Sequence, residues 1–339
     1  MISAVVVRAA QSIKEAKQAA ELIVQVFGAE SAQARSQHRQ RLALDPCADL
    51  RDLIVGVHGE EVVAVTRIIS RRLSWNGTWI PTSGLTHIAV RSDYRGRGLS
   101  RPLMEAALNR AGERQDVLAV LFARRAVGNF YAQFGFVGLG CHPELRAGSD
   151  VAHGLVSAGV RLTEGLHANE WAVYRTLYEA SYGEVPLSLM REASWWEAGA
   201  ERLALALGPD WSQQTYRILQ DETVIGYAIS RQGRIIEVGA EPDAQQACAL
   251  GLGLLARQWK QDLLVSMPPH HGVLRALQQH NHHLTIRYVW DGGHMARLLN
   301  PHHALEAAPW LALLKAPARL LATHDPLPEL PAWSVLDEF

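Results

Sequence analysis

The sequence lacks the features that mark several common classes of protein. Only three of its 339 residues are cysteines, and they lie far apart: Cys47, Cys141 and Cys248. This number and spacing fit neither a disulfide framework nor a zinc site, so we expect buried thiols in a reducing compartment and no bound metal. No apolar stretch reaches the length of a membrane-spanning helix, and the apolar run over residues 1–7 is too short for a signal peptide.

A strong net charge is missing as well. The chain carries 33 Lys and Arg residues against 34 Asp and Glu residues, which gives a formal net charge of −1. Proteins with a general affinity for nucleic acid carry a basic excess, so no nucleic-acid partner is expected. With 48% hydrophobic and 20% charged residues the composition is globular, and the length predicts two domains. We therefore expect a soluble, cytoplasmic protein without a membrane partner.

Arginine is nevertheless concentrated in one short stretch. It consists of Arg95, Gly96, Arg97, Gly98, Leu99 and Ser100. An apolar, strand-like run over residues 84–90 precedes it, and a helical pattern follows it as far as Gly112. A helix N-terminus presents backbone N–H groups without partners, glycine lets a ligand approach the backbone, and arginine suits phosphate oxygens. The stretch therefore predicts a site for a small polyanion.

The same stretch resembles the acyl-CoA-binding loop of the GNAT N-acetyltransferases, whose pattern is Q/R-x-x-G-x-G/A. Arg95 and Gly98 match this pattern, whereas Ser100 stands where the family has glycine or alanine. A second family element, F-Y-x-x-x-G-F, occurs about 35 residues later. Its matching residues are Phe130, Tyr131, Gly135 and Phe136. Two elements in this order are far more specific than either one alone.

The predicted order of elements over residues 1–145, β-α-α-β-β-β-α-β-α-β, is that of the GNAT fold. The residue pattern from Gly84 onward resembles that of the Eis-like branch, whose members carry a catalytic GNAT domain, a degenerate GNAT domain and a sterol-carrier-like domain. The resemblance implies an α/β (α+β) protein with two GNAT-like domains in tandem, each a mixed, mostly antiparallel sheet flanked by helices. We expect a catalytic domain at 1–150, a degenerate domain at 151–300, and a C-terminal helix with an extended tail at 301–339.

The second half of the chain repeats the order of elements but not the motifs. The counterpart of the loop, residues 239–244, contains two acids and no Gly/Arg pattern. The short helix near 273–279 lacks a Phe-Tyr pair. We therefore expect no CoA site in this half and one active site per chain. A single helix is predicted over 187–207, and the strands 284–290 and 295–299 are predicted to form a hairpin.

The resemblance also implies how acetyl-CoA, the expected cofactor, is held. The loop 95–100 would bind the pyrophosphate through backbone N–H groups. The strand Ile88-Ala89-Val90 would pair with the pantetheine arm, and a backbone N–H there can polarise the thioester carbonyl. Asn129 would bind the cofactor or cap the following helix. Tyr131 matches the family position that protonates the departing thiolate, although an aromatic packing role is the alternative.

Several candidates remain for the general base. His87 is the only titratable residue of the strand 84–90, and strand alternation predicts that it shares a face with Leu85 and Ala89. A histidine has a pKa suited to a base near neutrality. A packing role for this residue, transfer of the proton to water, and the terminal carboxylate of Phe339, which the resemblance suggests, are the alternatives. The paired histidines after residue 269 have no metal-ligand spacing, so solvated or capping roles are expected.

Taken together, these features predict an N-acyltransferase that moves an acetyl group from acetyl-CoA to a primary amine by direct transfer in a ternary complex. The acceptor would be a small-molecule or peptide amine. The alternative is a catalytically inactive acyl-CoA-binding sensor or scaffold, which Ser100 and the lack of an acidic base on the strand before the loop favour. The degenerate domain would shape the acceptor site or the interface of a homo-oligomer.

Overall fold

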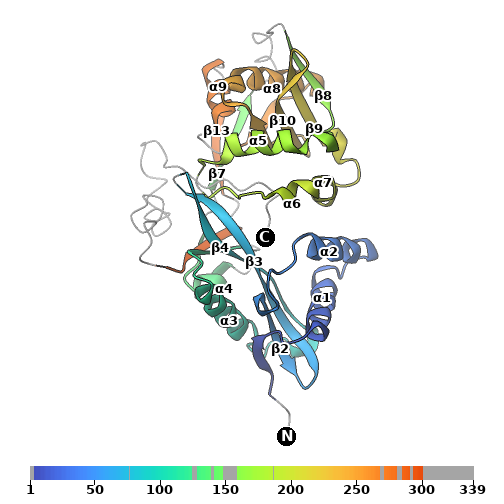
Figure 1. The fold of residues 1–339 in the computed structure, drawn as a ribbon, viewed down its shortest axis with the longest axis vertical. Coiled ribbons are helices and arrows are strands. Elements are labelled where there is room, and N and C mark those ends of the chain that lie inside the picture. Colours follow the sequence, from blue (N-terminus) through green and yellow to red (C-terminus); the bar gives the residue numbers. More distant parts are fainter. Residues whose placement is uncertain are drawn as a thin grey trace.

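The computed structural model contains two seven-stranded sheets, each flanked by helices (Figure 1). It describes residues 4–75, 77–123, 128–138, 141–147, 159–185, 187–267, 271–280, 285–290 and 293–300. Both sheets are mixed and mostly antiparallel, as the sequence predicted. Within these ranges, no helix is long and apolar enough to cross a membrane. The helix and tail predicted over 301–339, including Phe339, lie outside the described residues.

The first sheet has the strand order β1-β2-β3-β4-β5-β14-β6. Its strands are β1 (Val6–Ala9), β2 (Leu53–His58), β3 (Glu61–Trp75), β4 (Thr78–Val90), β5 (Leu118–Phe122), β14 (His294–Leu298) and β6 (Val137–Gly138). Its helices are α1 (Ile13–Phe27), α2 (Ala32–Leu44), α3 (Ser100–Glu113) and α4 (Gly128–Ala132). Helix α1, with α2 beside it, lies on one face of the sheet, and α3 with α4 lies on the other (Figure 1).

Local sequence explains why these elements form and where they pack. Ser12 caps α1, because its Oγ accepts a hydrogen bond from the Glu15 N–H at 3.2 Å, as the sequence predicted. Alternate residues of β3 supply two separate cores: Ala64 and Ile68 pack on the α3 side, whereas Val65 packs on the α1 side. The central strands are therefore buried on both faces and hold the loops at their ends in place.

The second sheet has the strand order β13-β7-β12-β11-β10-β9-β8. Its strands are β13 (Thr285–Trp290), β7 (Cys141–Ala147), β12 (Leu263–Ser266), β11 (Arg234–Ala240), β10 (Thr223–Arg231), β9 (Thr215–Gln220) and β8 (Val160–Glu164). Its helices are α5 (Trp171–Tyr182), α6 (Ala193–Glu197), α7 (Gly199–Leu207), α8 (Gln245–Trp259) and α9 (Gly272–His280). Helices α8 and α9 pack on one face, and an aromatic-rich cluster from α5, α6 and α7 packs on the other.

The two halves of the chain exchange one strand each. Strand β7 follows the first sheet in sequence but pairs with β12 and β13 of the second sheet. Strand β14, from the second half, pairs with β5 along its whole length. The prediction of a hairpin over 284–299 was therefore wrong, because β13 and β14 lie in different sheets. The domain boundaries near residues 150 and 300 stay a proposal. Strand β7 precedes residue 150 but belongs to the second sheet, and β14 follows it but belongs to the first.

A long hairpin made by β3 and β4 reaches from the first sheet to the second half of the chain (Figure 1). Near its tip, the Ser74 N–H donates to the Ser188 carbonyl at 2.9 Å, and the Leu187 N–H donates to the Ser74 carbonyl at 2.8 Å. Residues 188–190 therefore run beside β3. The single helix predicted over 187–207 was wrong at this point, because these residues pair with the hairpin and only α6 and α7 are helical.

Candidate active site

Strand β4 contains a bulge close to its end. Where its register with β3 shifts, Thr66 faces two residues of β4, His87 and Ile88. His87 has a φ of +54°, a left-handed conformation that non-glycine residues rarely adopt. As a result, Leu85 packs on the α3 side of the sheet and Ala89 packs on the α1 side. The prediction that His87 shares a face with both residues was therefore wrong, because the bulge interrupts strand alternation.

Strands β4 and β5 separate just before this bulge. They pair in parallel only from Thr82 to Gly84. Beyond Gly84, β5 continues beside β14, and no described strand pairs with the corresponding edge of β4. Residues 85–90 therefore present an open strand edge, which an extended ligand can join through main-chain hydrogen bonds.

The predicted anion loop connects β4 to α3. Gly96 and Gly98 both have a φ of +76°, and a Cβ added to either would meet nothing within 4 Å, so the loop requires glycine for its backbone conformation. Within the described part of the chain, the five consecutive N–H groups of residues 96–100 donate to no acceptor. These donors and the start of α3 form an arrangement that suits a phosphate group.

The buried side chain of Tyr94 supports the loop. It is 8% exposed, and its hydroxyl is hydrogen-bonded to His58 Nδ1 at 2.7 Å. The guanidinium carbons of Arg91 and Arg97 lie 4.7 and 4.5 Å from the centre of its ring. Arg95 Nε donates to the Val90 carbonyl at 3.2 Å. Arg97 therefore belongs to the scaffold of the loop, and Arg95 ties the loop to the end of β4.

A cavity of about 310 Å³ opens between the loop and the open edge of β4. Its lining residues are Val26, Ile88, Val90, Tyr94, Arg95, Gly96, Gly98, Leu99 and Ser100. The structure thus brings together seven of the ten residues predicted to bind the cofactor. Ala89 faces the core beside α1, Arg97 stacks on Tyr94, and Asn129 is exposed on α4. Sequence reasoning missed Val26 and Tyr94, although Tyr94 stands directly before the motif.

Tyr131 lies on α4, which α3 holds in place. Arg101 of α3 donates to the Gln133 Oε1 at 2.6 Å, and its guanidinium lies 5.2 Å from the centre of the Phe134 ring. The Tyr131 ring packs against the core on the α3 side and contacts Phe130 with a centroid distance of 5.2 Å. Burial raises the pKa of the Tyr131 hydroxyl, which therefore stays protonated at neutral pH. Among the described residues, none is hydrogen-bonded to this hydroxyl.

His87 is mostly buried on the α1 side of β4. Its ring meets Phe27 edge-on at a centroid distance of 5.2 Å, and its Nδ1 is hydrogen-bonded to the Thr86 hydroxyl at 3.0 Å. Burial lowers the pKa of His87 to about 3, and the positive charge of Arg67 contributes to this shift. The imidazole is therefore neutral near pH 7 and binds a proton only weakly.

The corresponding end of β11 in the second sheet is closed. The Val238 N–H donates to the Tyr182 hydroxyl at 3.3 Å, and the Val238 carbonyl accepts a hydrogen bond from His271 Nε2 at 2.9 Å. Ser181 Oγ accepts from the Ala240 N–H at 2.9 Å. Side chains of α5 and the residue before α9 thus occupy the backbone groups that stay open in β4.

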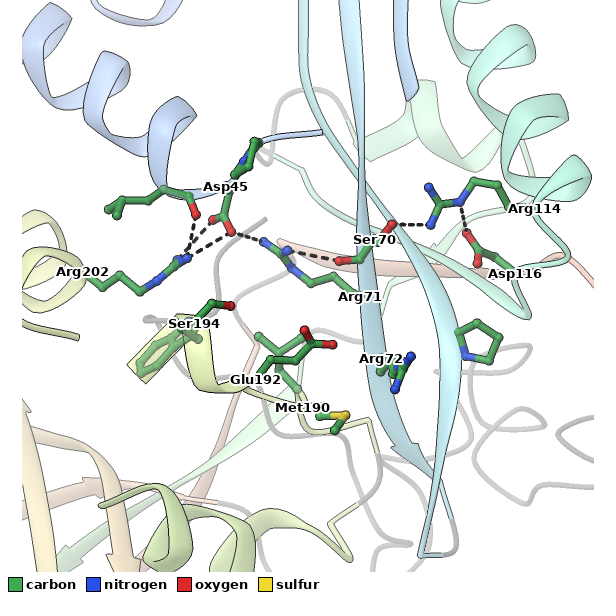
Figure 2. A pocket seen from close by; sticks show the side chains of 15 residues that line it. Asp45, Ser70, Arg71, Arg72, Arg114, Asp116, Met190, Glu192, Ser194 and Arg202 are labelled. Carbon is green, nitrogen blue, oxygen red and sulfur yellow. Dashed lines mark hydrogen bonds and ion pairs between the residues drawn. The ribbon is translucent and has the colours of Figure 1, made fainter. Parts of the chain in front are cut away.

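A second cavity, of about 440 Å³, lies where the two halves of the chain meet (Figure 2). Asp45, after α2, pairs with Arg71 of β3 at 3.1 Å and with Arg202 of α7 at 3.3 Å. Arg114 pairs with Asp116 at 3.1 Å on the opposite wall (Figure 2). The pair between Asp45 and Arg202 links the two halves. None of the residues predicted for cofactor binding or catalysis lines this cavity, so it is separate from the candidate active site.

Comparison with known proteins finds relatives of the first half of the chain. Residues 7–138 match the family described as the acetyltransferase (GNAT) domain. The N-acetyltransferase Eis of Mycobacterium tuberculosis and that of Mycobacterium bovis are each 26% identical over 264 residues. These alignments cover 74% of this chain and 63% of the relatives. The chain thus spans less than two thirds of the length of these relatives.

Solved structures with the same fold cover most of the chain. A probable N-acyltransferase of Enterococcus faecalis V583 has a TM-score of 0.67 at 16% identity, covering 91% of this chain and 75% of that one. The Eis1 protein of Mycobacterium abscessus has a TM-score of 0.63 at 18% identity, covering 89% and 75%. At this level of identity the likeness establishes the fold of both halves. The chemistry has to be argued from the residues of the site.

Proposed function

Because residues 7–138 match the acetyltransferase (GNAT) domain family, we propose that this protein transfers an acetyl group from acetyl-CoA to a primary amine within a ternary complex. The observation that carries the proposal is the cavity in which an open strand edge lies beside five unpaired N–H donors. A diphosphate and an extended amide chain need these two features side by side. The proposal covers the reaction type, and the acceptor is treated below.

The residues of the cavity fit acetyl-CoA in a defined way. The N–H groups of residues 96–100 would bind the pyrophosphate, and the positive end of the α3 dipole would add to the attraction. Arg95 and Asn129 would contact the cofactor at the rim. The edge of β4 at Ile88-Ala89-Val90 would pair with the pantetheine arm, and the Ile88 N–H would polarise the thioester carbonyl.

Acyl transfer then requires one bond to form and one to break. The lone pair of the amine attacks the carbonyl carbon, a C–N bond forms, and the C–S bond breaks. Tyr131 donates its hydroxyl proton to the departing thiolate, and the surplus proton of the amine leaves to water. The raised pKa is compatible with this role, because it keeps the Tyr131 hydroxyl protonated at neutral pH, and the proton that the thiolate needs is then present.

His87 has a narrower role in this proposal than the sequence predicted. A ring with a pKa of about 3 does not retain a proton taken from an ammonium group at neutral pH. The neutral imidazole can still accept a hydrogen bond from the incoming amine, with the Thr86 hydroxyl fixing the orientation of the ring. We therefore assign it to orienting the acceptor, and we assign the final proton acceptance to water.

A thiol-release assay tests the proposal. With acetyl-CoA and a panel of primary amines, we expect free CoA to appear only when both substrates are present. Tight CoA binding by calorimetry without turnover of any amine would favour the inactive sensor or scaffold instead. Tyr131→Phe should lower kcat by about 100-fold with an unchanged KM for acetyl-CoA, since general acids contribute about that much. The matched control Tyr216→Phe, in the second sheet, should keep the parental kcat.

A further inference from the structure

Arg67 of β3 is a buried cation without a counter-ion. It is 5% exposed, and one of its guanidinium nitrogens donates to the main-chain carbonyl of Asp45. No carboxylate in the described part of the chain pairs with it. By contrast, the equally buried Arg191 is bound by both carboxylate oxygens of Glu237. Buried charges are ordinarily paired, because taking a charge out of water costs several kcal/mol, so Arg67 calls for an anion from outside.

Arg67 lies next to the candidate acyl-transfer point. In the register between β3 and β4 it stands opposite Thr86, directly before the bulge at His87. Its Nε and Nη1 atoms form no hydrogen bond with the described residues. Neither atom is fully buried, so both keep some contact with solvent. A ligand that reaches the bulge from the α1 side therefore meets two guanidinium nitrogens whose N–H groups are unused.

The surroundings of Arg67 add positive charge. Helix α2, residues 32–44, contains three arginines and one histidine and neither Asp nor Glu. The nearby Asp45 carboxylate is already paired with two arginines. Burial lowers the pKa of His87, and the charges of Arg67 and Arg41 lower it further, so the positive field extends to the ring beside the bulge. A polycationic acceptor would be repelled from such a site.

We propose that the acceptor amine carries a carboxylate close to its amino group and that this carboxylate pairs with Arg67. The acceptor class is then an α-amino acid or a short peptide with a free carboxylate near the reacting nitrogen. Polyamines and aminosugars are excluded, because they lack this carboxylate. This inference rests on the proposed acetyl transfer, and it names the acceptor for that reaction. Arg67 holds the acceptor in place without exchanging a proton with it.

A carboxylate could also enter this site on the acyl chain, as in succinyl-CoA. We favour the acceptor, because Arg67 extends to the Asp45 carbonyl after α2, whereas the anion loop lies between the end of β4 and α3. The two sources differ in which substrate shows the preference. A preference for succinyl-CoA over acetyl-CoA with every amine would place the carboxylate on the acyl group and overturn the proposal.

Matched pairs of acceptors test the inference. Thiol release is measured with acetyl-CoA and with L-phenylalanine against 2-phenylethylamine, L-lysine against cadaverine, and glycine against methylamine. We expect kcat/KM to be about 10-fold to 100-fold higher for the carboxylated member of the pair that fits, as for other charge-assisted pairs. Equal rates within every pair, or a preference for cadaverine or spermidine, would overturn it.

Two arginine variants assign the preference to one residue. Arg67→Gln should reduce the ratio between the paired acceptors to about one while leaving the KM for acetyl-CoA unchanged. Arg72→Gln removes an exposed positive charge from the same strand and should keep the parental ratio. A merely structural role of Arg67 would lower the rates with both members of a pair alike and leave the ratio intact, which would also contradict the proposal.

Product binding tests the site independently of turnover. Thermal unfolding with added N-acetyl-L-phenylalanine should show a rise in Tm for the parent and for Arg72→Gln, and none for Arg67→Gln. Its decarboxylated counterpart, N-acetyl-2-phenylethylamine, should raise the Tm of none of them. If the product binds through Arg67 but no amine is ever acetylated, the proposed function fails and the carboxylate site stands. If amines are acetylated without any preference, the reverse holds.

Discussion

The two sheets end their central strands in the same way and then diverge. The N–H of Arg91, just after β4, donates back to the neighbouring strand at 2.9 Å, and the N–H of Glu241, just after β11, does the same at 3.0 Å. Counting back three residues from each makes Ile88 of β4 the counterpart of Val238 of β11. No described side chain bonds to the backbone of Ile88, whereas Tyr182 and His271 bond to that of Val238. In the second half of the chain, side chains thus bond to the strand backbone that stays open in the first half.

The loops after β4 and β11 also differ, in their free N–H groups and in their charge. Residues 96–100 leave five N–H groups without acceptors, whereas the second loop contains Pro242, which has no N–H, beside the acids Glu241 and Asp243. An anion would therefore be attracted to the first loop and repelled from the second. The comparison teaches that losing a ligand site requires a replacement for every interaction that the ligand made, since buried polar groups must stay paired.

The largest effect should come from breaking the buried ion pair of the second half. Glu237 of β11 directly precedes Val238, and it is held by Arg191 and by the Tyr227 hydroxyl at 2.8 Å. Arg191→Met leaves this carboxylate buried without a cation and should lower the free energy of unfolding by about 3–5 kcal/mol in urea titrations.

A double variant provides the control for that experiment. Arg191→Met combined with Glu237→Gln removes both charges and should recover part of the lost stability. The affinity of the folded single variant for CoA should match the parent, because the pair lies in the other sheet. A loss below about 1 kcal/mol in the single variant would mean that the pair does not stabilise the closed half.

The next effect concerns the open half. Gly98→Asp places a side chain on a residue with a φ of +76° and a negative charge among the unpaired N–H groups. We expect CoA affinity, measured by calorimetry, to fall by at least about 100-fold, since like charges in contact cost several kcal/mol. Gly77→Asp, at the tip of the β3–β4 hairpin with a φ of +71°, introduces the same strain and charge and should bind CoA normally. Retained affinity in Gly98→Asp would mean that the pyrophosphate binds elsewhere.

Features coded within a few neighbouring residues could be predicted from the sequence. The cap of α1 at Ser12, the two loop glycines and the acidic second loop all depend on residues a few positions apart. The fold class followed from the order of such local signals. The short helix that carries Tyr131 was predicted in the same way, because its residues lie side by side in the chain.

Features that depend on distant residues could not be predicted. The exchange of β7 and β14 is decided by which sheet edge each strand meets, and their own residues suit a strand in either sheet. The bulge at His87 arises from the register with β3 and changes the face on which the histidine lies. The isolation of Arg67 and the pairing of Arg191 are likewise visible only once residues far apart in sequence are brought together.

The smallest expected effect tests the closed cleft through its histidine. Burial lowers the pKa of His271 to about 4, so the folded protein keeps this ring neutral. The unfolded chain protonates it below about pH 6.5, so the unfolded state binds more protons and stability falls as the pH drops from 6.5 towards 4. His271 should contribute about 1 kcal/mol to the loss between pH 6.5 and 5.5, and almost nothing above pH 7.5.

His271→Asn isolates this contribution. The amide keeps a donor for the Val238 carbonyl but does not titrate, so urea unfolding should show a pH dependence that is shallower than the parent by about one proton below pH 6.5. His87→Asn should flatten the same range, because the pKa of His87 is lowered to about 3. Only the His87 variant should alter acetyl transfer. If His271→Asn changes CoA binding, or leaves the pH slope of stability untouched, then the cleft of the second half is not the closed counterpart of the first.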